Sequence, residues 1–202
     1  MAKKAIVLLA EGFEEVEALT PVDYLRRAGI EVTIASVGIK DAGESPLVTG
    51  SHGIKAAADT ALETLAAERK LESAAWDAVI VPGGLPGADN LAASAETQVF
   101  VKSMAGAGKP ICSICASPAR VLAPLGLLTG KKFTCYPGQE ANIRAGDAAG
   151  AERLQDRVVI DGNLITSQGA GTAGEFSIAI IAKLAGEAEA EKLRERLLLC
   201  CC

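Results

Sequence analysis

Short apolar runs alternate with segments of helical periodicity along most of this chain, and this alternation limits the folds it can adopt. Runs rich in Val, Ile and Leu predict buried strands at 4–9, 31–37, 78–81 and 111–114. Apolar residues at helical spacing predict helices at 16–27, 97–107, 171–184 and 187–198. Strands and helices that alternate in this way form βαβ units, in which the strands run parallel.

Two hairpins are predicted beside these units. Asp161-Gly162 lies between two apolar runs, and Asp-Gly at such a place is typical of a two-residue β-hairpin. A smaller hairpin is predicted at 49–58, inserted after the second strand, because Gly50 and Gly53 lie within it. No linker, repeat or shift of composition divides the sequence, so we expect a single domain over residues 1–202.

The composition constrains the kind of core that this domain can have. Half of the 202 residues are apolar, but only 3% are aromatic. The core must therefore be built from Ala, Val, Ile and Leu, which suits a parallel sheet buried on both faces. We expect an α/β fold, namely a three-layer α/β/α sandwich with a mostly parallel sheet and the small inserted hairpin.

Charge and cysteine usage argue against several classes of protein. A net charge of -5, without a cluster of Lys and Arg among aromatic residues, argues against nucleic acid as a partner. No apolar run approaches the ~18 residues of a membrane span, and Glu11 ends the first run too early for a signal peptide. Three of the six cysteines are adjacent at 200–202, which suits neither a secreted disulfide framework nor a tetrahedral metal site. We therefore expect a cytoplasmic protein without a membrane segment or a metal.

Cys115 is the first candidate for a functional residue. It ends the apolar run 111–114 and precedes a helical pattern, with Ser113 and Ser117 two residues to either side. A nucleophile displayed on a sharp turn between strand and helix needs small neighbours at these positions. A helix N-terminus would lower the pKa of the thiol, so Cys115 is predicted to be partly thiolate at neutral pH. The alternative is a buried cysteine that acts as a small hydrophobe.

The carboxyl ends of the predicted strands supply further candidates, because ligands of parallel sheets bind there. Glu11, Glu14 and Glu15 follow the first strand, where acidic residues are typical of a helix N-terminus. Glu17 lies within an apolar stretch instead. Burial would raise the pKa of its carboxyl and make it a proton carrier near neutral pH.

The glycine loop after the third strand is a candidate oxyanion site. Residues 83–87 read GGLPG, which has neither the GxGxxG spacing nor the Lys-Ser/Thr of a phosphate-binding loop. Glycine lets a backbone amide approach a reacting oxygen closely, and the Ala116 amide would be its partner. Glycine turns are also common after strands without any such role.

Five sequence blocks occur together in order, and their combination is specific. They are AEGFEEVE at 10–17, PVD at 21–23 with RRAG at 26–29, VPGG at 81–84, ICASP at 114–118 and TSQGAGT at 166–172. With these blocks the chain resembles the ThiJ/PfpI superfamily, in the branch of the Parkinson-disease protein deglycase (DJ-one). The resemblance implies a flavodoxin-like fold, a homodimer and no cofactor. It further implies Cys115 as nucleophile, Glu17 as its acid/base partner, and Gly84 and Ala116 as donors of oxyanion amides.

Activities reported for this branch include glyoxalase, deglycase and redox-sensing functions, and the resemblance does not choose among them. As a glyoxalase, Cys115 would attack methylglyoxal and Glu17 would move a proton between its carbons, giving lactate without metal, nicotinamide or glutathione. As a deglycase it would remove methylglyoxal adducts from glycated proteins. The alternative is a redox-sensing chaperone whose Cys115 is oxidised to a sulfinate.

The chain departs from its relatives at the histidine that they often carry near the cysteine. Tyr136 stands at that position and would line the pocket, donate a hydrogen bond or simply pack. The single histidine, His52, falls in the predicted small hairpin, where we expect it to be solvated. Without a Cys-His dyad, a cysteine hydrolase or protease is only a minor alternative.

Cys112 and Cys135 are weaker candidates for functional residues than Cys115. Cys112 and Cys115 form a C-x-x-C, but two residues three apart on a strand are separated by ~10 Å, beyond the reach of a disulfide. We expect Cys112 in the core. Cys135 lies next to Tyr136 in the sequence and is a candidate second modifiable thiol.

Overall fold

The computed structural model describes residues 2–39 and 45–199. The strands are β1 (Lys4–Ala10), β2 (Glu31–Val37), β3 (Leu47–Thr49), β4 (Lys55–Ala57), β5 (Thr60–Ala61), β6 (Ala78–Val81), β7 (Ile111–Ile114), β8 (Lys132–Phe133), β9 (Glu152–Arg153), β10 (Val158–Asp161) and β11 (Leu164–Ser167). The α-helices are α1 (Glu15–Arg27), α2 (Leu62–Ala67), α3 (Gly87–Ala93), α4 (Ala95–Gly106), α5 (Ala173–Ala185) and α6 (Glu187–Arg196). A π-helical turn spans Pro118–Leu122.

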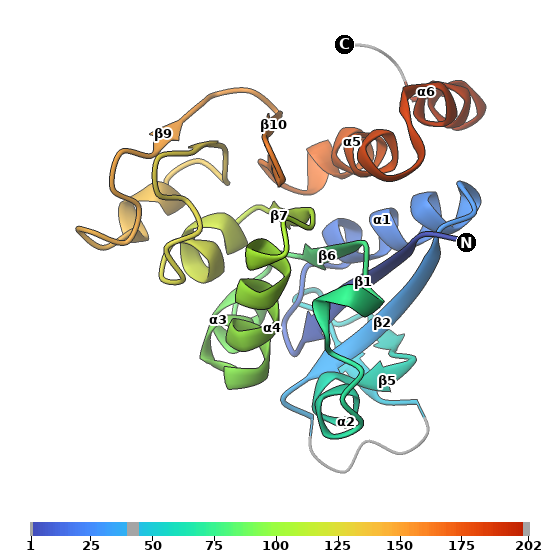
Figure 1. The fold of residues 1–202 in the computed structure, drawn as a ribbon, viewed down its shortest axis with the longest axis horizontal. Helices are drawn as coiled ribbons and strands as arrows, with labels where there is room; N and C mark the ends of the chain where they lie inside the picture. The colour runs from blue at the N-terminus through green and yellow to red at the C-terminus, as the bar shows by residue number, and fades with distance from the viewer. Residues whose placement is uncertain (1, 40–44, 200–202) are drawn as a thin grey trace.

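One mostly parallel sheet organises the molecule (Figure 1). Its strands lie in the order β10-β11-β7-β6-β1-β2-β5, and β10 alone among them runs antiparallel to its neighbour. The order places β1 in the interior, with β6 on one side and β2 on the other. Chain segments that leave the carboxyl ends of β1, β6 and β7 therefore meet at one edge of the sheet.

Helices cover both faces of the sheet, as the alternation of side chains along β1 shows. Ala5, Val7 and Leu9 pack in one apolar cluster with residues of α1 and α5. Ile6 and Leu8 pack in a second cluster with residues of α2, α3 and α4. Because successive side chains of a strand point to opposite faces, these two clusters lie on opposite sides of the sheet. The predicted three-layer α/β/α sandwich is confirmed.

Most elements lie where the sequence predicts them. Strands β2, β6 and β7 have the predicted bounds, and β3 with β4 forms the predicted inserted hairpin. Helix α4 begins two residues before the predicted start because the Ser94 hydroxyl caps it, accepting the Thr97 N–H at 3.1 Å. The sequence did not predict helices α2 and α3 or strands β5, β8 and β9, since six or seven helical residues and two-residue strands give little periodicity.

None of the helices in the described part of the chain is long and apolar enough to cross a membrane. The three terminal cysteines at 200–202 lie outside the described residues.

Candidate functional site

Cys115 lies on the sharp turn that follows β7. Its φ is +64°, a value that residues other than glycine seldom adopt and that the surrounding structure must hold in place. Two backbone hydrogen bonds do so: the Cys115 N–H donates to the Ser167 carbonyl at 3.0 Å, and the Tyr136 N–H donates to the Cys115 carbonyl at 2.9 Å. The thiol is thus displayed from a braced elbow at the carboxyl end of the strand.

The two serines that flank the elbow are buried, as small neighbours should be. The Ser117 hydroxyl donates to the Pro82 carbonyl at 2.5 Å and so ties the elbow to the loop after β6. The Ser113 hydroxyl has no hydrogen-bond partner among the described residues. The predicted helix does follow, but as a π-helical turn that begins with Pro118.

Glu17 faces Cys115 from the first turn of α1. Its side chain is only 1% exposed. The helix is held at this end by Glu14, whose carboxylate accepts the Glu17 N–H at 2.7 Å. The carboxyl itself accepts the Gly83 N–H at 3.0 Å and hydrogen-bonds the Cys115 side chain. Segments after β1, β6 and β7 therefore converge on this one carboxyl.

The environment of Glu17 makes it a group that titrates near neutral pH. Burial raises the pKa of its carboxyl, the hydrogen bonds from Cys115 and Gly83 oppose this, and the charge of Glu14 adds to it. The balance raises the pKa of Glu17 to about 7. This agrees with the inward-facing carboxyl that its apolar sequence context predicts.

The pKa of Cys115 moves in the direction opposite to the prediction. Burial and the neighbouring Glu17 carboxyl raise the pKa of the thiol, although the backbone N–H groups of Gly84 and Ala116 hydrogen-bond the sulfur and favour the anion. The N–H groups at the elbow favour the thiolate, but burial and the Glu17 carboxyl outweigh them. In the resting site the thiol holds its proton and donates it in a hydrogen bond to Glu17.

Gly83 is a site residue that the sequence analysis missed. A Cβ added there would lie 2.5 Å from Glu17 Oε2, 2.6 Å from Cys115 Cβ and 3.1 Å from the sulfur, closer than real Cβ atoms come. The absence of a side chain at Gly83 is what lets carboxyl and thiol meet. The signal was present in the Gly83-Gly84 doublet, but only Gly84 was assigned a role, because the approach of Glu17 cannot be seen from local sequence.

Tyr136 lies beside this group on the segment that follows the elbow. Its ring approaches Gly169 so closely that a Cβ on this glycine would lie 3.3 Å from Tyr136 Cδ2 and 3.7 Å from Glu17 Oε1. The tyrosine is 53% exposed. It therefore packs against Gly169 near the carboxyl while about half of its surface stays exposed.

A second polar cluster joins α1 to the inserted hairpin. Glu15 is buried, and its carboxylate accepts the His52 backbone N–H at 2.7 Å and contacts His52 Nδ1 at 2.8 Å. Burial alone would raise the pKa of Glu15, but the hydrogen bonds from His52 outweigh it and lower the pKa to about 2. The His52 side chain is 70% exposed, as expected, and contacts Glu15 and Ser51 rather than the thiol. Glu15 is thus more than a helix-end charge: it anchors the hairpin turn.

This cluster also contains the group of side chains best placed to hold a cation among the described residues. One ligand atom each from Glu14, Glu15 and His52 lie within 4.8 Å of one another. The Glu15 oxygens already accept hydrogen bonds from the hairpin, and the Glu14 carboxylate caps α1. The three groups are therefore engaged in holding the local fold.

The remaining described cysteines are buried. Cys112 lies on β7 in the core, as expected, and burial raises the pKa of its thiol. Cys135 is also fully buried, with its sulfur 3.8 Å from the Glu140 carboxylate. Burial is the main cause that raises the pKa of Cys135, which disfavours the thiolate needed for modification.

Comparison with known protein families gives one match that spans most of the chain. Residues 3–183 match the model of the DJ-1/PfpI family. The Parkinson disease protein 7 homolog of Danio rerio is 38% identical over 197 residues, which cover 98% of this chain and 97% of the relative. A deglycase of Pyrococcus horikoshii is 32% identical over 165 residues, which cover 82% of this chain and 89% of the relative.

Some relatives are much longer than this chain. Protein DJ-1 homolog A of Arabidopsis thaliana is 39% identical over 194 residues, which cover 96% of this chain but only 45% of the relative. The corresponding homolog B is covered over 41% of its length. The chain thus spans less than half the length of these two plant relatives.

Solved structures agree with the fold. DJ-1beta of Drosophila melanogaster superposes with a TM-score of 0.85 at 35% identity, covering 100% of both chains. An oxidized DJ-1 of Toxoplasma gondii superposes with a TM-score of 0.84 at 36% identity, covering 98% of both chains.

Proposed function

The chain belongs to the DJ-1/PfpI family, and from that premise we propose that it is a cofactor-independent deglycase or glyoxalase that acts on methylglyoxal or its protein adducts. The observation that carries the proposal is the contact between Cys115 and Glu17, a thiol and a buried carboxyl that share one hydrogen bond. The name of the Pyrococcus relative supports a deglycase-type reaction. A small dicarbonyl offers a free aldehyde carbon to the thiol. In a glycated protein the same carbon is bonded to a protein amine or thiol, which would leave with a proton as the Cys115 sulfur takes its place.

The first step uses the protonation states that the site favours. As the sulfur attacks the aldehyde carbon, a C–S bond forms, the thiol proton passes to the Glu17 carboxylate, and the carbonyl electron pair moves onto the oxygen. This transfer removes the obstacle of the raised thiol pKa, because the base already accepts the thiol hydrogen bond. The backbone N–H groups of Gly84 and Ala116 converge near the sulfur and are the proposed donors to this oxyanion.

The second step is an internal oxidation and reduction of the bound substrate. Glu17 first gives the former thiol proton to the oxyanion and becomes a carboxylate again. It then removes the proton from the first carbon and returns it to the neighbouring ketone carbon, while the hydroxyl proton passes to the ketone oxygen. The first carbon becomes a thioester and the second an alcohol. Water then adds to the thioester, the C–S bond breaks, lactate leaves and the thiol regains its proton. A carboxyl with a pKa of about 7 suits both halves of this transfer.

The proposal is tested by a time course of lactate formation from methylglyoxal with purified protein. Cys115→Ala and Glu17→Gln should each remove activity, because one lacks the nucleophile and the other the proton carrier. Cys135→Ala is the matched control, since it removes a buried thiol whose sulfur contacts Glu140 rather than Glu17. Full lactate production by Cys115→Ala or by Glu17→Gln would overturn the mechanism.

A second candidate function, redox sensing with chaperone activity, uses the same site. Cys115 is only partly buried, and a protonated Glu17 could donate a hydrogen bond to a sulfinate oxygen. We propose that peroxide converts Cys115 to the sulfinate and that Glu17→Gln alters its accumulation. Mass spectrometry of peroxide-treated protein decides this, and absence of a sulfinate at Cys115 would reject it.

Proteolysis is a weaker candidate because its usual dyad is missing. In the described structure the His52 side chain bonds Glu15, and Tyr136 contacts Cys115 through a backbone hydrogen bond rather than through its side chain. A cysteine protease needs an imidazole to activate its thiol and to protonate the leaving amine.

Further expectations remain proposals of the same kind. We propose a homodimer, for which the exposed apolar side chains Val16, Leu47 and Ile54 on α1 and the inserted hairpin supply a candidate surface. We also propose that residues 1–202 act as one domain and that the protein works in the cytoplasm. The unpaired cysteines of the described chain support a reducing compartment.

A further inference from the structure

A groove on the opposite side of the sheet from α1 has the features of a second binding site. It has a volume of about 480 Å³ and lies between the end of α2 with its following loop and the first half of α4. Pockets for small molecules commonly span roughly 300 to 1,000 Å³ and are lined mainly by apolar side chains. The apolar part of the lining comes from Leu71 and from Val99, which is 70% exposed, together with Ala66 and Ala95. Phe100 is only 1% exposed and forms the base beneath them. None of the lining residues belongs to the site around Cys115.

The backbone at Arg69 is unusual for the residue that it carries. Arg69 has a φ of +56° and directly follows Glu68, the C-cap residue of α2. The Arg69 N–H donates to the Ala66 carbonyl and the next N–H to the Leu65 carbonyl, a helix end at which glycine is the usual residue. Glycine would adopt this conformation at a lower cost than arginine does.

The arginine side chain is also free to bind a ligand. Its neighbours in the chain, Glu68 and Lys70, form an ion pair with each other at 2.8 Å. Within the described residues, the Arg69 guanidinium has neither an ion pair nor a hydrogen bond, and the Glu72 carboxylate likewise has none. By contrast Glu96, at the other end of the groove, accepts a hydrogen bond from the Ser94 hydroxyl at 3.2 Å.

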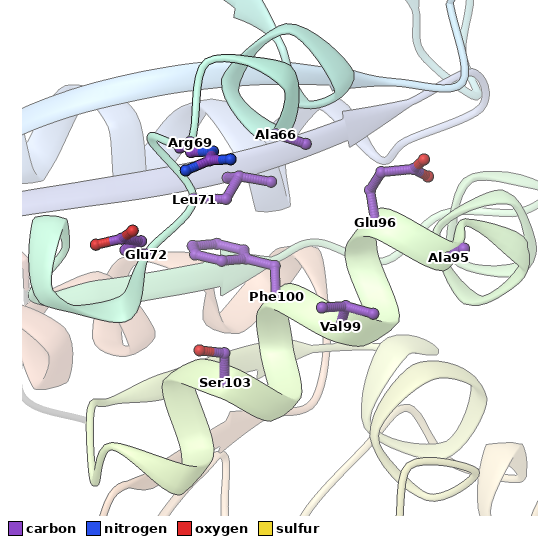
Figure 2. Close-up of a pocket in the computed structure, with 9 residues that line it drawn as sticks. All are labelled: Ala66, Arg69, Leu71, Glu72, Ala95, Glu96, Val99, Phe100 and Ser103. Atoms are coloured by element: carbon purple, nitrogen blue, oxygen red, sulfur yellow. The ribbon is translucent and has the colours of Figure 1, made fainter.

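Charges of both signs therefore border the same apolar surface. Figure 2 shows Arg69 and Glu72 toward one end of the groove with the Phe100 ring beside them, and Val99 and Glu96 toward the other. We propose that this groove binds a free α-amino acid with an apolar side chain. Its carboxylate would pair with Arg69, in the forked geometry that guanidinium favours, and its ammonium with Glu72. Its side chain would lie on Leu71, above the buried ring of Phe100.

Titration of isotope-labelled protein by NMR tests this with L-phenylalanine as the probe. Saturable shifts should appear in the amides of 66–72 and 95–103. Phenylpropionate lacks the ammonium and phenethylamine lacks the carboxylate, so the affinity of each should be lower by a factor of about 10 or more. Arg69→Gly and Glu72→Gln should weaken phenylalanine binding by about the same factor.

The matched control is Lys70→Gln, which removes a neighbouring positive charge that does not line the groove. It should bind phenylalanine as the unaltered protein does. Arg69→Gly should keep or raise its thermal midpoint, because glycine suits the positive φ, so lost binding would not reflect lost folding. The proposal is overturned if no saturable shift appears, if either analogue binds as tightly as phenylalanine, or if Arg69→Gly binds unchanged. Equal weakening by Lys70→Gln would overturn it as well.

Discussion

Replacement of Glu17 by Gln should stabilise the protein at alkaline pH while it removes activity. The carboxyl has an ordinary pKa of 4.5 in the unfolded chain and of about 7 in the folded site. The folded state therefore holds this proton more tightly, and stability falls as pH rises from the lower value through the higher one. At about 1.4 kcal/mol per pH unit, ionising the buried carboxyl costs about 3 kcal/mol above neutral pH.

Glutamine keeps the size and the hydrogen-bonding ability of the protonated carboxyl but never ionises. Glu17→Gln should therefore exceed the unaltered protein in free energy of unfolding by only about 1 kcal/mol at pH ~5, and by about 3 kcal/mol at pH ~8. In a chain of this length that gain corresponds to roughly 6 to 12 °C in Tm.

Urea unfolding at both pH values measures the difference, with protein concentration held constant because self-association would add its own stability. Glu17→Asp is a useful companion, since it keeps the charge but shortens the reach to Cys115 and Gly83. A gain of equal size at both pH values would refute the reasoning, because it would show that packing rather than ionisation is responsible. A loss of stability near about pH 8 would refute it more directly.

Three further outcomes follow from the same contacts. Gly83→Ala should lower lactate formation by about 100-fold because its methyl would separate thiol and carboxyl, whereas Gly171→Ala, where a Cβ meets nothing within 4 Å, should be silent in the same assay. Glu17→Gln should lower the pKa of Cys115, since the carboxylate raises it, and the pH dependence of alkylation by iodoacetamide would show this; an unchanged profile contradicts it. Glu15→Gln should cost about 2 kcal/mol near neutral pH, with the loss shrinking as the pH falls toward 2 and the carboxylate of the unaltered protein takes up a proton. An equal difference in urea midpoint between Glu15→Gln and the unaltered protein, near neutral pH and at the acidic end of this range, would contradict this last prediction.

Long, buried elements could be predicted from the sequence, and short elements could not. Strand β7 (Ile111–Ile114) is buried along its whole length and bounded by a proline and the elbow, so its apolar run matched its bounds. Strand β8 (Lys132–Phe133) is two residues long, and its pairing with β9 depends on a neighbour far along the chain. The sequence around β8 does not indicate which distant segment it pairs with.

The candidate site was predicted in part for a related reason. Glu17 and Cys115 each stand out locally, one by its apolar surroundings and the other by its elbow. The role of Gly83 and the raised pKa of Cys115 arise only when the three segments meet, because both depend on distances between them. The local sequence therefore indicates Glu17 and Cys115 as candidates, but it does not show that Glu17 raises the pKa of the Cys115 thiol.

The strands of the sheet lie in space in a different order from their order along the chain, and this affects the newly synthesised protein. Glu17 follows β1 and Cys115 follows β7, and β6 lies between these strands in space, so the pair exists only after all three have assembled. A chain leaving the ribosome displays Glu17 first and Cys115 long afterwards, and until they meet each has the chemistry of an ordinary side chain. Partly built molecules therefore lack the pair, and the hydrogen bond between Cys115 and Glu17 forms only once the three segments have come together.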